Sequence, residues 1–197
     1  MTRLSRALTI LSLTLPLAGC ISFGEKPPTH FLSLSADAQR PAGQNMTAQD
    51  RNAVSVAVPV TAAALRNQHI AVVTADNAVA YLPKALWADV PPNLFRNVLA
   101  ETIEAKTGRF VPDVRNASIT PDTRLGGTLS AFQLVGGQNK VVVVYDATLA
   151  KSGSDLIRTR RFEAVVPTAS EQPDSVGAAL NRASNIVATD VAAWISG

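Results

Sequence analysis

The residue with the most distinctive chemistry is Cys20, the only cysteine in a chain of 197 residues. It directly follows Leu17, Ala18 and Gly19, which are one aliphatic residue and two small ones. Small side chains at these positions fit the pocket of a signal peptidase.

The residues before Cys20 have the composition of a secretory signal. Arg3 and Arg6 supply a positively charged start, and an apolar run follows over residues 7–18. That run has the length of a signal core and is shorter than the roughly 20 residues that a membrane-spanning helix needs. We therefore predict a signal peptide over residues 1–19.

An aliphatic residue, two small residues and a cysteine in this order resemble the lipobox of bacterial lipoproteins. The resemblance implies that cleavage falls between Gly19 and Cys20 and that the Cys20 thiol is linked to diacylglycerol through a thioether. It also implies that the new N-terminal amine carries a further acyl chain such as palmitate. Three acyl chains would hold the protein on a membrane permanently, whereas one chain binds only marginally. The alternative is an ordinary signal peptide followed by a buried thiol.

The charge of the exported chain excludes the class of nucleic-acid-binding proteins. The full chain has 18 basic and 15 acidic residues, but Arg3 and Arg6 lie in the predicted signal, which leaves 16 against 15. Such a balance lacks the basic footprint of proteins that bind nucleic acid. The chain is 47 % hydrophobic and 17 % charged, which is typical of one globular domain with an apolar core.

Residues 20–30 are expected to be an acylated cysteine and its tether. Gly24 and the pair Pro27–Pro28 disfavour regular structure there. The nine residues from Ile21 to Thr29, fully extended, reach at most about 30 Å. This length keeps the following domain, residues 31–197, close to its membrane. Ile21 stands where an aspartate would be expected in lipoproteins retained in the enterobacterial inner membrane. The analogy therefore favours the outer membrane, with the domain facing the periplasm.

Alternating apolar residues predict several short strands in the first half of this domain. The alternation is clearest in residues 54–60, which contain four valines. Two apolar runs, over residues 70–73 and 78–81, flank Asp76–Asn77 and are typical of a hairpin. Residues 31–34 alternate as a further short strand.

Two helices are predicted from apolar residues at steps of three and four. The first begins at Pro91–Pro92, after Asp89 as a candidate cap, and ends at Gly108. The second begins at Pro173, and its apolar stripe from Val176 to Trp194 is suited to pack on a sheet.

Three longer strands are predicted between the helices. Their separators, GGQNK and KSGSD, contain the residues that tight turns require, so the three strands form an antiparallel meander. Arg158, Arg160 and Arg161 suit an edge strand, where charge blocks unwanted pairing. The predicted fold class is α+β with two layers, a mostly antiparallel sheet covered by two helices. The predicted strand ranges are 124–135, 140–150 and 156–166.

The order of these elements resembles the family of ABC-type transport auxiliary lipoproteins. The most specific part of the resemblance is Tyr81 followed by Trp87-Ala88-Asp89, just before the first helix. The resemblance covers roughly residues 29–195. One departure is Phe31, where the family often has tyrosine.

This resemblance implies a part in lipid trafficking. Members work with an inner-membrane ABC-type or related complex and with MCE-domain proteins, which carry lipids across the periplasm. The lipoprotein is implied to be a docking or gating subunit at the inner leaflet of the outer membrane, able to form homo-oligomers, without a cofactor and not an enzyme. Two alternatives remain: an envelope assembly lipoprotein, and a binding lipoprotein that carries a lipid itself.

The residues that could support catalysis form no recognised site. His30 and His69 have no partner at metal-ligand spacing, and the chain has no G-x-S-x-G motif. Asp146, inside an apolar strand, is either an acid with a perturbed pKa or a bonded residue of the surface. We therefore predict neither a catalytic residue nor a metal site.

The candidate partner interface consists of Trp87, Tyr81 and the arginines Arg158, Arg160 and Arg161. Tryptophan is enriched in interface hot spots, so Trp87 either belongs to an apolar partner surface or fills the space between the sheet and the first helix. The three arginines either contact acidic lipid head groups or an acidic partner, or form a solvated edge.

Overall fold

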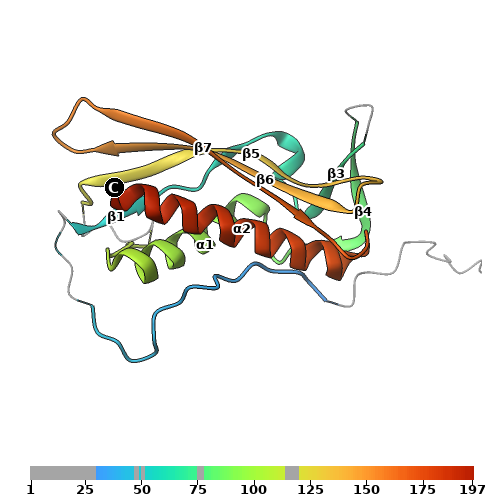
Figure 1. Cartoon of the computed structure of the whole chain (residues 1–197), viewed down its shortest axis with the longest axis horizontal. Helices are drawn as coiled ribbons and strands as arrows, with labels where there is room; N and C mark the ends of the chain where they lie inside the picture. The colour runs from blue at the N-terminus through green and yellow to red at the C-terminus, as the bar shows by residue number, and fades with distance from the viewer. Residues whose placement is uncertain (1–29, 47–48, 50–51, 75–77, 114–119) are drawn as a thin grey trace, which may run out of the picture.

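The computed structural model describes residues 30–46, 49, 52–74, 78–113 and 120–197. The predicted signal peptide, Cys20 and the tether as far as Thr29 lie outside this part, as do Asp76 and Asn77 of the predicted hairpin turn. The described residues form one sheet of seven strands with two helices beneath it (Figure 1), which confirms the predicted α+β class.

The sheet is mixed and open. Its strand order is β4-β3-β5-β6-β7, and β1 and β2 also pair with β5. The strands β1, β2 and β3 run parallel to β5, and the other pairs are antiparallel. The strands are β1 (Val54–Val56), β2 (Val60–Thr61), β3 (His69–Val73), β4 (Val79–Leu86), β5 (Thr123–Val135), β6 (Lys140–Lys151) and β7 (Ile157–Pro167).

The meander of β5, β6 and β7 matches the prediction to within one residue at each end. Its two turns contain Gly137 and Gly153, whose φ angles of +73° and +74° lie in the left-handed region that favours glycine. Within the described residues β7 pairs only with β6, so the arginine-bearing strand is an edge of the sheet as predicted.

Both helices begin at the predicted prolines. α1 (Pro91–Thr107) ends at Gly108, whose φ of +67° closes the helix, and α2 (Pro173–Ser196) covers β6 and β7. The expected cap at Asp89 is wrong, because the cap position is Val90. The Asp89 carboxylate instead accepts hydrogen bonds from the Val90 N–H and the Asn93 amide. No helix in the described part of the chain is long and apolar enough to cross a membrane.

The core lies between the sheet and the helices, and five of its buried side chains among the described residues are large aromatic ones. Trp87 meets Phe132 edge to face at 5.6 Å, and Phe95 meets Tyr145 in the same way at 5.4 Å. The Tyr145 hydroxyl donates to the Gly126 carbonyl at 2.7 Å, and burial raises the pKa of this phenol. The buried hydroxyl therefore has a backbone partner, as a polar group in a core requires.

One predicted strand is replaced by a single bridge. In residues 31–34 only Leu32 pairs with the sheet, through Trp87. The following residues turn along α2, because two asparagines of that helix bind their backbone. A 3-10 turn at Ala63–Leu65 joins β2 to the next strand.

Candidate functional site

The first described residues fix where the tether joins the domain. The Leu32 N–H donates to the Leu86 carbonyl at 2.8 Å, and the Ala88 N–H donates to the Leu32 carbonyl at 2.7 Å. Gly177 of α2 leaves room for the Leu32 side chain, since a Cβ there would lie 3.1 Å from the nearest Leu32 carbon. His30 lies 2.9 Å from Asp174 in the first turn of α2.

Beyond Leu32 the chain is held along α2 by two asparagines one helical turn apart. Asn181 accepts a hydrogen bond from the Ser35 N–H at 2.9 Å, and Asn185 accepts one from the Asp37 N–H at 2.7 Å. The Asn185 amide also donates to the Ser35 carbonyl at 2.9 Å. Because of these contacts, the first described residues lie near the N-terminus of α2, at the end of the molecule near β4 (Figure 1).

Trp87 lies in the core and not on the surface. Its side chain has no exposed area. Of the two roles considered for Trp87, its burial supports the one in the core. Trp87 is therefore no longer part of the candidate interface.

Tyr81 and the three arginines lie on opposite edges of the sheet. Tyr81 belongs to β4, is 41 % exposed, and its hydroxyl donates to the Ala64 carbonyl at 3.3 Å. Its ring lies 5.2 Å from that of His69. Because β4 and β7 are the two ends of the strand order, the structure does not bring Tyr81 and the arginines together.

Arg161 forms an ion pair on the sheet face away from the helices. Its guanidinium donates to both carboxylate oxygens of Asp146, at 2.6 and 3.0 Å, and the Ser130 hydroxyl donates to the same carboxylate. The Arg161 guanidinium, with the help of Ser130, holds the pKa of the Asp146 carboxyl below its usual range. Asp146 is thus a bonded residue of the surface, the second of the two interpretations given to it.

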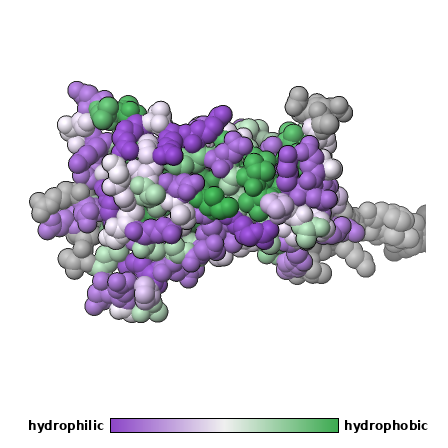
Figure 2. All heavy atoms as spheres, viewed as in Figure 1, coloured by the Kyte–Doolittle hydropathy of each residue, from purple (hydrophilic) through white to green (hydrophobic). Residues whose placement is uncertain are grey.

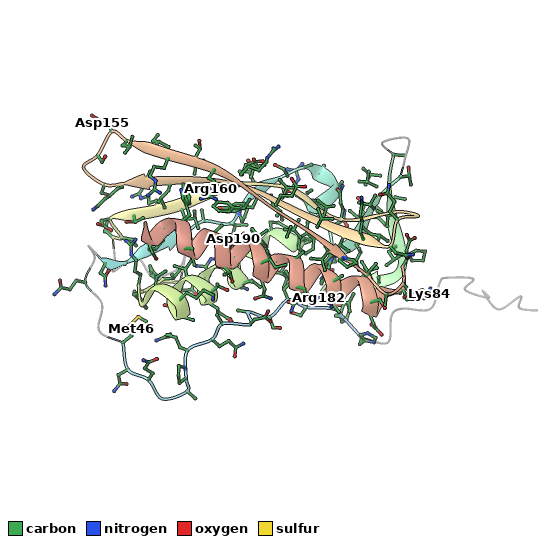
Figure 3. All side chains as sticks on the ribbon, in the orientation of Figure 1. Met46, Lys84, Asp155, Arg160, Arg182 and Asp190 are labelled. Atoms are coloured by element: carbon green, nitrogen blue, oxygen red, sulfur yellow. The ribbon has the colours of Figure 1, made fainter. Side chains whose placement is uncertain are left out.

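Arg158 and Arg160 lie toward the C-terminal end of α2. Arg158 is 5.0 Å from the centre of the Trp194 ring and donates to the Trp194 carbonyl at 3.3 Å. Arg160 lies over the Phe162 ring at 5.1 Å. Figure 3 shows Arg160 on the same side of the molecule as Asp190 of α2, and both residues line one shallow pocket with Arg158.

A second pocket, of about 560 Å³, opens beside Arg158 at the end of the domain away from His30. It lies where the C-termini of both helices meet the β6–β7 hairpin and the start of β5. Three cations line it, namely Arg109, Lys151 and Arg158, together with Asp122. Its residues come from several elements distant in sequence, so no motif or spacing could have revealed it.

The surface also carries a small hydrophobic area. Figure 2 shows it where β7 crosses above α2, with hydrophilic residues on both sides. Val165 of β7 and Ile186 of α2 are exposed hydrophobic residues of these two elements.

The histidines take part in local hydrogen bonds. A ring nitrogen of His69 lies 3.2 Å from the Asn67 side-chain oxygen, and His30 contacts Asp174. Across the residues that the structure describes, no group of three or more His, Cys, Asp and Glu side chains could hold a metal ion.

Comparisons with known proteins give a family and a shared fold. The family model described as "ABC-type transport auxiliary lipoprotein component" matches residues 32–192. No curated protein sequence matches the chain. Among solved structures, an uncharacterized protein is similar with a TM-score of 0.65 and 16 % identity, over 85 % of this chain and 100 % of the other. A Xanthomonas campestris protein of the DUF330 family is similar with a TM-score of 0.66 and 20 % identity, over 85 % and 94 % of the two chains.

Proposed function

Because the chain belongs to the ABC-type transport auxiliary lipoprotein family, we propose that it is the outer-membrane docking subunit of an intermembrane lipid transport system. The family membership makes the protein a transport-associated lipoprotein, and the family is not one of enzymes. The partners proposed for it are an MCE-domain protein of the periplasm and an ABC-type or related inner-membrane complex, with further copies of the chain forming a homo-oligomer.

The observation that carries the docking role is the position of His30, the last residue of the predicted tether, relative to α2. The chain leaves the domain beside Asp174, near the start of α2, while the far pocket contains Ile195, near its end. These residues are 21 positions apart in a 24-residue helix, and at 1.5 Å per residue the distance along it is about 32 Å. Acylation of Cys20 would fix one end of the domain at the membrane and leave the opposite end free to meet a partner.

The anchor is tested by Cys20→Ser. We expect this variant to lose labelling by palmitate and to leave the outer-membrane fraction, while the native chain is found there. A second variant, Ile21→Asp, tests the sorting analogy in an enterobacterial host, where it should move the protein to the inner-membrane fraction. An unchanged fractionation of Cys20→Ser would contradict the lipid anchor.

The partner is tested by purifying the lipidated protein in mild detergent and identifying the proteins that accompany it by mass spectrometry. We expect an MCE-domain protein, and we expect Arg160→Glu to reduce its recovery. The matched control is Arg66→Glu, which makes the same charge reversal at an exposed arginine beside β3. Recovery of cell-wall assembly factors alone would favour the envelope assembly alternative, and recovery of no partner would contradict the docking role.

A further inference from the structure

We infer that the pocket between the C-terminal ends of the two helices binds the anionic head group of a lipid. The pocket itself is described by its residues, but the source of its ligand, a transported lipid, rests on the proposed function. Its volume of about 560 Å³ is in the range of small-molecule sites, roughly 300–1,000 Å³.

The charges of the pocket leave cations available to a ligand. Arg109 lies 3.6 Å from Asp122, the one acidic side chain among the described residues that line the pocket. Arg109 also donates to the Thr123 hydroxyl at 2.8 Å, so it belongs to the wall. Lys151 remains, and Arg158, which gives one N–H to the Trp194 carbonyl, keeps further guanidinium N–H groups for a ligand. A phosphate would form charge-assisted hydrogen bonds with both.

Apolar side chains form the rest of the wall. Leu149 and Ile195 are buried behind the pocket, and Leu156 stands at its rim in the β6–β7 hairpin with 67 % of its surface exposed. A free phosphate would leave this apolar surface in water, and an uncharged chain would leave the cations without a partner. A ligand with an anionic head and an attached acyl chain satisfies both parts of the wall.

The position of the pocket indicates from which side such a lipid would arrive. It is about 32 Å along α2 from Asp174, which His30 contacts. A head group in this pocket therefore faces away from the proposed anchor and toward the partner that delivers or receives the lipid.

The test uses the mature lipidated chain in phosphatidylcholine nanodiscs and a short-chain phosphatidylglycerol with a photoreactive acyl group. We expect cross-links in residues 149–156 and at the C-terminal end of α2, identified by mass spectrometry. Unlabelled dihexanoyl phosphatidylglycerol should compete at least tenfold better than dihexanoyl phosphatidylcholine, which has the same chains and no net charge. Equal competition by both lipids, or cross-links elsewhere, would overturn the proposal. Equal competition by inorganic phosphate would overturn the assignment to a lipid.

Lys151→Gln removes one of the two available cations at an exposed position, with little risk to the fold. Losing a charge-assisted hydrogen bond should weaken binding of the phosphatidylglycerol about tenfold. Lys140→Gln makes the same change at the opposite end of β6 and should leave binding unchanged. Equal affinities of the two variants would contradict the role of Lys151.

The outcomes separate this inference from the proposed function. Lipid binding without recovery of an MCE-domain partner would contradict the docking role and leave the pocket assigned. Recovery of the partner without cross-links in the pocket would overturn the lipid site and leave the docking role in place.

Discussion

Gly127 stands where any side chain would collide with the neighbouring strand. A Cβ at this position would overlap the carbonyl oxygen of Asp146 and lie 3.0 Å from the Cα of Ala147. Its φ of +144° is also a value that residues with a side chain rarely adopt. Both obstacles come from backbone atoms in the interior of the sheet, so they cannot be relieved by moving a flexible side chain.

We therefore predict that Gly127→Ala lowers the free energy of unfolding by about 3 kcal/mol. The neighbouring change Gly126→Ala is the control, because its Cβ would meet nothing within 4 Å and its φ is not positive. Urea denaturation of the two variants measures the difference. Similar midpoints for both would show that β5 can move away from β6 at this point.

The ion pair between Asp146 and Arg161 predicts how stability changes in acid. Because the folded state lowers the pKa of the Asp146 carboxyl, the pair stabilises the protein fully above the unfolded pKa of about 3.9. That contribution is lost as the pH falls below this value and through the lower pKa of the folded state. Asp146 is 35 % exposed, so solvent screening keeps the effect small.

Melting curves of the native chain and Asp146→Asn should show this dependence. We expect a lower melting temperature for the variant at pH 6, and a difference that narrows below pH 4. The same experiment in high salt should reduce the difference at pH 6, because screening weakens an exposed pair. A difference that widens in acid would mean that the carboxyl pKa is raised by folding, which is the opposite sign.

At the scale of elements, the asparagines of α2 determine whether the start of the domain stays docked. Asn185 is buried and satisfies both the Asp37 N–H and the Ser35 carbonyl. Asparagine is a poorer helix former than alanine, so replacing it by alanine would stabilise the helix if Asn185 made no tertiary contacts. The hydrogen bonds are therefore the reason to expect a loss.

We predict that Asn185→Ala lowers the free energy of unfolding by about 1.5 kcal/mol and exposes the Asp37 amide to exchange. Hydrogen exchange of residues 34–37 measures the local effect. The control is Asn97→Ala at an exposed position of α1, where the higher helix propensity of alanine should leave stability equal or slightly raised. Unchanged exchange at Asp37 would show that the docking depends on Leu32 instead.

The elements differ in how far the sequence determined them. The meander and both helices were predictable because their limits are local, with glycines in the turns, prolines at the helix starts and Gly108 at the end of α1. The parallel pairing of β1, β2 and β3 with β5 was not, because short strands gain their partners only from the folded sheet. Residues 31–34 alternate like a strand, yet α2 holds the backbone that follows them.

The candidate site shows the same division. The lipidation of Cys20 and the family were both predicted from residue order; the family match confirms the family, and the lipidation stays a prediction. The burial of Trp87 and the distance between Tyr81 and the arginines depend on how the sheet is assembled. The pocket of Arg109, Lys151 and Arg158 could not be predicted from the sequence, since it exists only where two helix ends and a hairpin meet.

At the scale of the whole molecule, the two ends of the domain along α2 differ. Lys84 lies at the end where the N-terminal segment leaves, and Asp155 lies at the tip of the β6–β7 hairpin at the other end (Figure 3). Lys84 lines a pocket with His30 and Asp174, and Ser154, next to Asp155, lines the far pocket with Ile195. With the proposed anchor at one end, the long axis of an upright domain would point away from the membrane surface.

Single cysteines at these two positions test the orientation, because the chain has no other cysteine than Cys20, whose thiol the proposed acylation blocks. We predict that a donor dye on Lys84→Cys transfers energy strongly to acceptor lipids in a nanodisc, and that the same dye on Asp155→Cys transfers little. The expected difference follows from a separation of about 32 Å along α2 between the two ends of the domain. The native chain should take up no dye, and labelling there would contradict the acylation of Cys20. Equal transfer from both positions would mean that the domain lies flat, so that the far pocket would face lipids of its own leaflet.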